Sequence, residues 1–408
     1  MPCGDAVALR SAVVLGTVAV VCLAGVPAAA VPTYVRDEPA LAVAAPATVY
    51  LEATYDGYLR NKGGRLISRD QVTVTRRCSG AVVNPDGYVV TNTVCVRPSK
   101  EVLLVNALYR HGRALVEKNE LAAKELDAYV GRLGETSVFT GRRRGSAPIR
   151  RLLAQVAPAT ADITSAPAAP AAVTAVLSPV DGNAALVKLQ RAGLPAIEVG
   201  PVADPVSKSS LLILGFGRDE ATDGSVRYVV RHRAVDVVGR TGTNRFGVGG
   251  EVGPDSRGGP VVDKSGRLVA ILDTDTSDPN QPVRDLITTA TINRLLAKGK
   301  VEPRLGAVDQ AFRAALADYF AGRYSRAVGA FDAVLRQDAS HTAARVYRAR
   351  AQERLERDGD AVENSADWLL YLLSAAGGVL IIAGTTQVRR RCVRPSASTS
   401  GNGRRAET

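Results

Sequence analysis

Ser256 is the residue of this chain that could act as a nucleophile, because it stands in the glycine-rich segment DSRGGP, residues 255–260. A serine hydroxyl reacts when a neighbouring base takes its proton, and histidine is the side chain that titrates near neutral pH. The chain has three histidines. His111 lies in a helical pattern, His232 in a basic strand pattern and His341 at a helical turn, so we expect surface or packing roles for all three. These residue types offer a weak nucleophile without a base.

Two segments of the chain resemble catalytic segments of the trypsin-like and HtrA-like serine peptidases. The first is CSGAVVNPDGYVVTNTVCV, residues 78–96, and in that family a similar turn leads into a strand that ends in TAAHC or TNAHV. Val94 stands where the family has its histidine. The second is NAALVKL, residues 183–189, which resembles DLAVLKI with Asn183 in the place of the orienting aspartate. The resemblance therefore implies a peptidase fold whose base and orienting carboxylate are both missing.

The third segment, DSRGGPVVDKSGRLVAI at residues 255–271, resembles the family's GNSGGPVVDKDGRVVGI. In this alignment Arg257 replaces the nucleophilic serine. If Pro254 and Arg257 are instead read as insertions, the family's GDSGGP is restored and a serine survives without a base. Either alignment alters the turn whose backbone N–H groups form the family's oxyanion hole. The expected cleft and oxyanion region comprises Asp255, Ser256, Arg257, Gly258 and Gly259.

The resemblance implies a mainly β fold, a chymotrypsin-like double β-barrel at residues 46–305. We expect a serine pseudopeptidase that binds a peptide or envelope protein without cleaving it. The alternatives are an active serine endopeptidase with an unconventional site using Ser256, and a purely structural spacer. In trypsin-like enzymes a disulfide joins the cysteine that opens the first segment to the one directly after the histidine. Cys78 and Cys95 occupy these places, so the resemblance implies that they are bonded. They are also the single pair of cysteines in the exported part of the chain, and an oxidising compartment favours a disulfide between them.

The local patterns place these segments on strands. Residues 48–59 and 71–83 are rich in β-forming residues, and Pro85-Asp86-Gly87 is typical of a tight turn. Residues 103–135 have the helical spacing of leucine and alanine, with Gly134 as a stop, and predict an amphipathic insertion. A partner-binding arm is the other interpretation of this insertion. The second barrel should begin after the strand that Asn183 opens.

Beyond residue 305 the pattern becomes helical, and residues 306–357 predict a small module. GRYSRAVGAFDAVLRQDASH, residues 322–341, resembles the second half of a tetratricopeptide unit. Helices over residues 309–321 and 342–355 would complete three helices. A single repeat buries little core, so we expect the module to pack on the barrels or on another protein. A plain helical stalk is the alternative.

The two ends of the chain indicate export and a membrane anchor. An apolar run before Ala28-Ala29-Ala30 predicts a signal peptide at residues 1–30, cleaved after Ala30 or kept as an anchor, and a linker at 31–45. Residues 368–388 carry no charge and would form a helix roughly 30 Å long, which matches a bilayer core. Arginines cluster in the tail at 389–408, which predicts a cytoplasmic tail and an extracytoplasmic N-terminal domain.

Composition limits the classes of partner that we expect for this chain. The net charge is +12, and six arginines of the tail contribute to it, where they would face anionic lipid. Aromatic residues make up only 5% of the chain and no nucleic-acid motif is visible, so nucleic acid is excluded as an expected partner. No cofactor or metal motif is visible either. We expect an extracytoplasmic peptide or protein as the ligand and the membrane as the anchoring surface.

Overall fold

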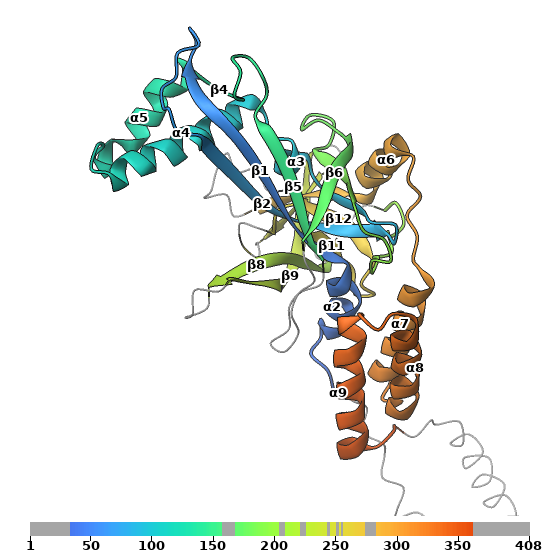
Figure 1. Cartoon of the computed structure of the whole chain (residues 1–408). Coiled ribbons are helices and arrows are strands. Elements are labelled where there is room, and N and C mark those ends of the chain that lie inside the picture. Colours follow the sequence, from blue (N-terminus) through green and yellow to red (C-terminus); the bar gives the residue numbers. More distant parts are fainter. Residues whose placement is uncertain are drawn as a thin grey trace, which may run out of the picture. The chain divides into compact units, whose positions relative to one another are not determined.

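The computed structural model describes residues 33–156, 168–203, 209–220, 226–242, 245–249, 253, 256–273 and 283–361 (Figure 1). The predicted signal peptide, the apolar segment 368–388 and the tail lie outside these residues. None of the helices in these described ranges is long and apolar enough to cross a membrane.

The first barrel is built from antiparallel strands around β1. The strands are β1 (Thr48–Asn61), β2 (Val72–Asn84), β3 (Tyr88–Asn92), β4 (Ser137–Thr140), β5 (Ile149–Val156), β6 (Ala169–Val176) and β7 (Ala184–Leu189). Their order is β2-β3-β7-β6-β5-β1-β4, and a further pairing of β2 with β1 closes six of them into a ring. The tight turn between β2 and β3 falls at Pro85-Asp86-Gly87, as predicted, and Gly87 has a φ of +96° there.

The second barrel begins after β7, also as predicted. Its strands are β8 (Ser210–Glu220), β9 (Val226–Gly242), β10 (Arg245–Gly249), β11 (Pro260–Val262), β12 (Leu268–Asp273) and β13 (Val283–Thr288). They close in the order β10-β13-β12-β11-β8-β9. The helix α6 (Thr289–Gly299) follows and packs on β6 and β7 of the first barrel. The two rings confirm the predicted mainly β, double-barrel fold.

The predicted insertion is a pair of helices on the first barrel. A four-residue helix, α3 (Thr93–Val96), leads into α4 (Lys100–Glu117), and α5 (Leu126–Gly134) ends at the glycine expected to stop it. Leu103, Ala107 and Leu108 of α4 are buried in the barrel's core, because their spacing keeps them on one face of the helix. Figure 1 shows α4 and α5 beside β4 and the outer parts of β1 and β2.

The C-terminal module has the three expected helices, α7 (Ala307–Phe320), α8 (Tyr324–Gln337) and α9 (Thr342–Asp358). Its core contains Phe312, Phe331 and Tyr347, and the Phe331 ring contacts the rings of the other two. The module also bonds to the segment that links the two barrels. Asp309 accepts a hydrogen bond from the Ala196 N–H at 3.1 Å, and Arg313 pairs with Glu198 at 2.8 Å.

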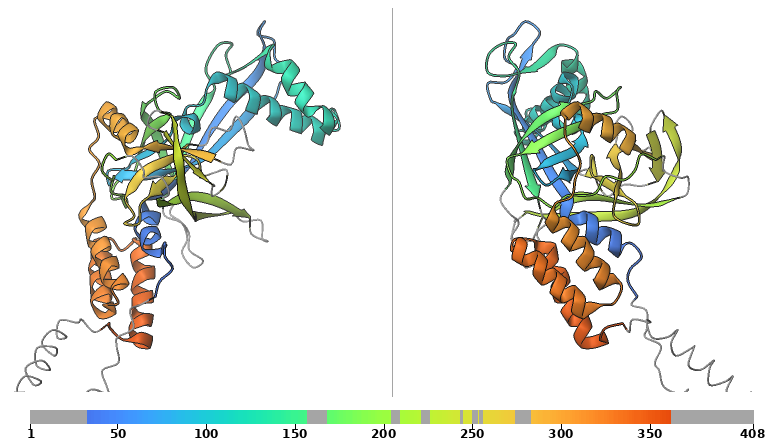
Figure 2. Two further views of the ribbon diagram at one scale, coloured as in Figure 1. Left: turned by 180° about the vertical axis from the view of Figure 1, so that it is seen from behind. Right: turned by 90° about the vertical axis from the view of Figure 1, so that its right-hand side faces the viewer.

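The prediction of a linker at residues 31–45 is wrong for its second half. Residues Glu38–Ala44 form the helix α2, and a short 3-10 turn at Ala45–Ala47 leads directly into β1. Alanine is the strongest helix former, and its small side chain allows close packing on both sides. Ala40 and Ala44 are buried in the first barrel's core, whereas Ala42 is buried in the core of the helical module. Figure 2 shows α2 beside α7 and α9.

Candidate functional site

The structure brings two of the three resembling segments together through Asn183. Val94 lies in α3, directly after β3, and Asn183 lies directly before β7, which pairs with β3. The Thr93 N–H donates to the Asn183 carbonyl at 2.9 Å, and the Val94 N–H lies 3.3 Å from Asn183 Oδ1. Asn183 has a φ of +52°, in the left-handed region that asparagine tolerates better than most residues. The predicted positions of base and orienting residue are therefore neighbours, and neither side chain titrates.

A carboxylate nevertheless lies in this site, on Asp273 at the end of β12. Its side chain is 1% exposed. Oδ1 accepts hydrogen bonds from Asn92 Nδ2 at 2.5 Å and from Asn183 Nδ2 at 2.9 Å. Oδ2 lies 3.2 Å from Arg245 Nη2, an ion pair without hydrogen-bond geometry. Among the described residues, the partners of this carboxylate are therefore two amides and a guanidinium.

Burial is the main influence on the ionisation of Asp273. It raises the pKa of this carboxyl to about 6, against the opposing pull of Arg245 and of the two asparagine amides. Sequence reasoning missed Asp273, Asn92 and Arg245. The signal that could have found Asp273 is a single acidic residue directly after the apolar run LVAIL, residues 268–272.

Ser256 is packed in the interior. Its side chain is 0% exposed, and Oγ donates to the Gly253 carbonyl at 2.5 Å. The strand β8 lies against it so closely that a Cβ atom added to Gly215 would be 2.4 Å from the Ser256 Cβ. The hydroxyl is therefore held by the backbone of its own turn and does not face solvent.

The turn around Ser256 uses its backbone donors internally. The N–H groups of Ser256, Gly258 and Gly259 donate to the carbonyls of Gly253, Leu272 and Ser256, at 3.1, 2.8 and 2.8 Å. Gly258 has a φ of +78°, and an added Cβ would lie 2.3 Å from Thr91 Oγ1. Those three amides are thus unavailable to an oxyanion. Asp255 of the predicted cleft region lies outside the described residues.

Arg257 is anchored beside the disulfide and close to a second cation. Cys78 and Cys95 are bonded, with their Cα atoms 6.1 Å apart, which confirms the predicted pair. The Ser79 N–H donates to the Arg257 carbonyl at 2.8 Å. Burial and, second, the positive charge of Arg257 lower the pKa of Arg76 to about 10, so Arg76 stays protonated at neutral pH.

Arg76 was not anticipated from the sequence. It lies on β2, two residues before Cys78, and its Nε is buried without a hydrogen-bond partner in the described part of the chain. The region beside the disulfide therefore holds two guanidinium groups, those of Arg76 and Arg257, in addition to Arg245 near Asp273.

The three histidines lie elsewhere, as expected. His111 Nδ1 bonds to the Tyr129 hydroxyl at 2.7 Å within the helical insertion. His341 Nδ1 accepts from the Ala344 N–H at 3.1 Å and caps α9. His232 is exposed on β9. Burial lowers the pKa of both His111 and His341. The described residues contain no group of three or more histidine, cysteine, aspartate or glutamate side chains that could hold a metal ion.

Comparison with known families supports the same interpretation of the barrels. Residues 78–271 match the family described as the trypsin-like peptidase domain. This range begins at Cys78, contains Val94, Asn183 and Arg257, and ends within β12.

The chain is similar to a solved structure, that of the serine endoprotease from Yersinia pestis. The identity is 15%, the alignment covers 66% of this chain and 67% of that chain, and the TM-score is 0.37. No curated protein matches the chain.

Proposed function

We propose that this chain is a membrane-anchored, extracytoplasmic serine pseudopeptidase that binds a peptide or an envelope protein without hydrolysing it. The observation that carries the proposal is the hydrogen bond between Asn183 and Asp273 beside Val94. The Asp273 carboxylate is turned toward two asparagine amides and Arg245. No imidazole is within this network to receive a proton from a serine.

The chemistry of acyl transfer makes this arrangement inactive. The attacking hydroxyl must lose its proton to a base, and the leaving amine must receive one. Val94 can do neither. Ser256 would also have to break its hydrogen bond to Gly253 and leave a closed turn before it could reach a substrate. Loss of single triad members from active enzymes lowers kcat by roughly 10⁴-fold or more, so we expect no measurable turnover.

Peptide binding does not require the triad. Peptidases of this fold hold an extended peptide by backbone hydrogen bonds along a barrel strand, and these bonds remain possible here. Arg76 and Arg257 add positive charge next to the disulfide. A guanidinium pairs best with a carboxylate, so we propose an acidic side chain or a peptide C-terminus as the group recognised there.

The inactive site can be tested with a fluorophosphonate probe on the purified full-length chain, with active trypsin as the positive control. We expect no covalent labelling. Labelling that disappears in Ser256→Ala would show that a nucleophile survives, and would favour the alternative of an active serine endopeptidase.

The binding proposal needs a separate measurement. On an array of peptides with free or amidated C-termini, we expect wild-type chain to prefer acidic or free-carboxylate peptides and Arg257→Ala to lose that preference. Arg143→Ala, in an exposed loop, is the matched control. Equal binding by Arg257→Ala and wild type would show that Arg257 does not recognise the carboxylate.

The membrane topology is also part of the proposal. It is supported by the uncharged run at 368–388, by the arginines that follow it and by the acidic residues before it. Protease added to intact spheroplasts should degrade the barrels and leave the tail. Full protection of the barrels would contradict this topology.

A further inference from the structure

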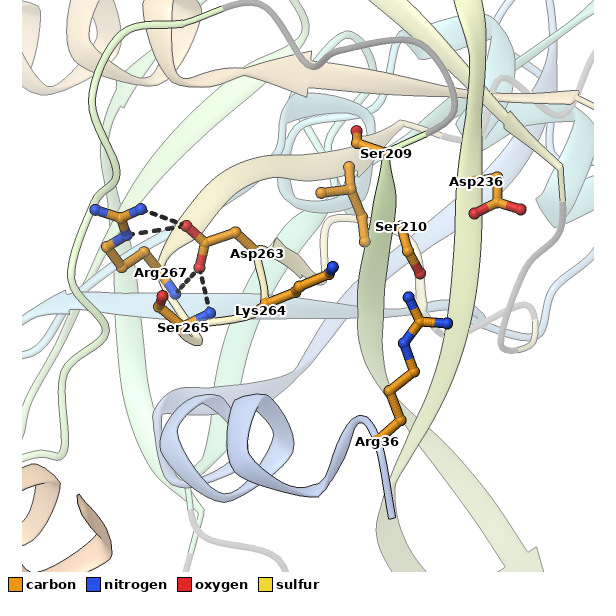
Figure 3. A pocket seen from close by; sticks show the side chains of 9 residues that line it. Arg36, Ser209, Ser210, Asp236, Asp263, Lys264, Ser265 and Arg267 are labelled. Carbon is orange, nitrogen blue, oxygen red and sulfur yellow. Dashed lines mark hydrogen bonds and ion pairs between the residues drawn. The ribbon is translucent and has the colours of Figure 1, made fainter. Parts of the chain in front are cut away.

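A cavity that shares no residue with the Val94–Asn183 site has a volume of about 570 Å³ (Figure 3). It lies where four parts of the chain meet: the segment before α2, the start of β8, the strand β9 and the turn between β11 and β12. Its lining residues are Arg36, Ser209, Ser210, Leu211, Asp236, Asp263, Lys264, Ser265 and Arg267. The volume falls within the range of about 300 to 1,000 Å³ that is typical of small-molecule sites.

The β11–β12 turn is a rigid wall of this cavity. Asp263 Oδ1 accepts from the N–H groups of Ser265 and Arg267 at 2.9 and 3.0 Å. Oδ2 pairs with the Arg267 guanidinium at 2.8 Å. Figure 3 shows all these bonds on one side of the turn. The charge of Asp263 is therefore matched by Arg267, and the turn holds Lys264 between them at the edge of the cavity.

Two cations line the cavity without an ion-pair partner in the part of the chain that the structure describes. Among the described residues, the side chains of Arg36 and Lys264 form no ion pair and no hydrogen bond. Figure 3 shows both charged ends directed into the cavity, with the Ser210 hydroxyl next to Arg36. Ser209 Oγ is buried and does not face these two charged groups.

We propose that this cavity binds the phosphate group of a small phosphate ester or phosphodiester. Such a group offers several acceptor oxygens in a tetrahedral arrangement, which suits a guanidinium, an ammonium and a hydroxyl approaching from different sides. Arg36 and Lys264 supply the charge, and the Ser210 hydroxyl supplies a neutral donor. The cavity is larger than a phosphate ion needs, so the rest of the ligand fills the remaining space.

Asp236 also lines the cavity, on β9 and paired with Ser210 of β8. Figure 3 shows its carboxylate on the same side of the cavity as Ser210 and Arg36, and it forms no ion pair with Arg36 among the described residues. Its negative charge opposes an anion. Removing Arg36 or Lys264 should therefore weaken phosphate binding, whereas Asp236→Asn should strengthen it.

The experiment is isothermal titration calorimetry on the purified full-length chain at constant ionic strength. The probes are inorganic phosphate, glycerol 3-phosphate and glycerophosphoglycerol, a phosphodiester headgroup without acyl chains. We expect Arg36→Ala and Lys264→Ala each to weaken binding about fivefold or more, and Asp236→Asn to tighten it by a similar factor. Lys124→Ala, exposed on the helical insertion, should change nothing.

The probes distinguish the two sources of the ligand. Tighter binding of phosphate or the monoester identifies a soluble phosphate compound, and tighter binding of the diester identifies a lipid headgroup. No heat from any probe would overturn the proposal, as would equal affinities in wild type, Arg36→Ala and Lys264→Ala. Circular dichroism melting of each variant ensures that a lost signal reflects the cavity and not unfolding.

Discussion

Asn183 donates a hydrogen bond to Asp273 across 2.9 Å, from the first barrel to the second. The two residues are 90 positions apart in the chain and lie on segments that face each other between the barrels. The amide stands where the resembling family has its orienting aspartate, and the carboxylate stands at the end of β12 in the second barrel. The buried carboxylate of this pair makes the stability of the fold depend on pH.

The first prediction concerns the pH dependence of the stability of the fold. The pKa of Asp273 rises from 3.8 in the unfolded chain to about 6 in the folded protein, so the folded protein binds more protons between these values. Asp273 therefore stabilises the fold most below pH 4, and this contribution is lost as the pH rises through 6. The full difference is about 3 kcal/mol at most.

Urea unfolding of wild type and Asp273→Asn at pH 4.5, 5.5 and 7 measures this contribution. Relative to Asp273→Asn, wild type should lose unfolding free energy as the pH rises from 4.5 to 7. A constant difference at every pH would show that Asp273 does not titrate there.

The second prediction concerns the turn at Gly258. Gly258→Ala should destabilise the fold by about 3 kcal/mol or more, because the new methyl group meets Thr91 and the Ser79 carbonyl in addition to the left-handed strain. Gly145→Ala is a matched control: its φ is also +78°, and nothing lies within 4 Å of the added atom. We expect that variant to lose only about 1 kcal/mol. Equal losses in chemical unfolding would mean that the turn relaxes around the methyl group.

The third concerns the disulfide. The bond between Cys78 and Cys95 closes a loop with a sequence separation of 17 and holds α3 against β2. Replacing both cysteines with alanine should lower the unfolding free energy by about 3 kcal/mol, since the unfolded chain gains freedom. The same loss should follow when wild type is unfolded with a reductant. An unchanged unfolding midpoint in both experiments would contradict this.

The fourth concerns Tyr34, which lies in the segment before α2. Its hydroxyl donates to the Tyr319 carbonyl at 2.7 Å and lies 2.8 Å from the Tyr324 hydroxyl, while its ring contacts Phe320 edge-on. Tyr34→Phe should cost about 1 kcal/mol through the lost hydrogen bonds. Tyr34→Ala should cost about 2 to 3 kcal/mol, because the ring contacts are lost as well.

Limited proteolysis provides the readout for Tyr34. Cleavage within α7 to α9 should be fastest in Tyr34→Ala, intermediate in Tyr34→Phe and slowest in wild type. If all three are cleaved at the same rate, the N-terminal segment does not stabilise the module.

The barrels were predictable because their signals are local. The turn at residues 85–87 and the helix end at Gly134 depend on single residues with restricted or permissive backbones. The disulfide followed from a family resemblance. Asp273 was not predictable, since its partners Asn92 and Asn183 are 181 and 90 residues away and share no spacing with it. The helix α2 was missed because alanine and proline are typical of linkers, and only burial shows that its alanines pack.

The helix α2 also has a consequence for biosynthesis. Its residues leave the ribosome before both barrels, whereas Tyr319, the partner of Tyr34, follows 285 positions later. Until α7 to α9 are made, the face of α2 that carries Ala42 has no native surface to cover it. A chain truncated during synthesis before residue 307 therefore leaves this face of α2 without its native covering.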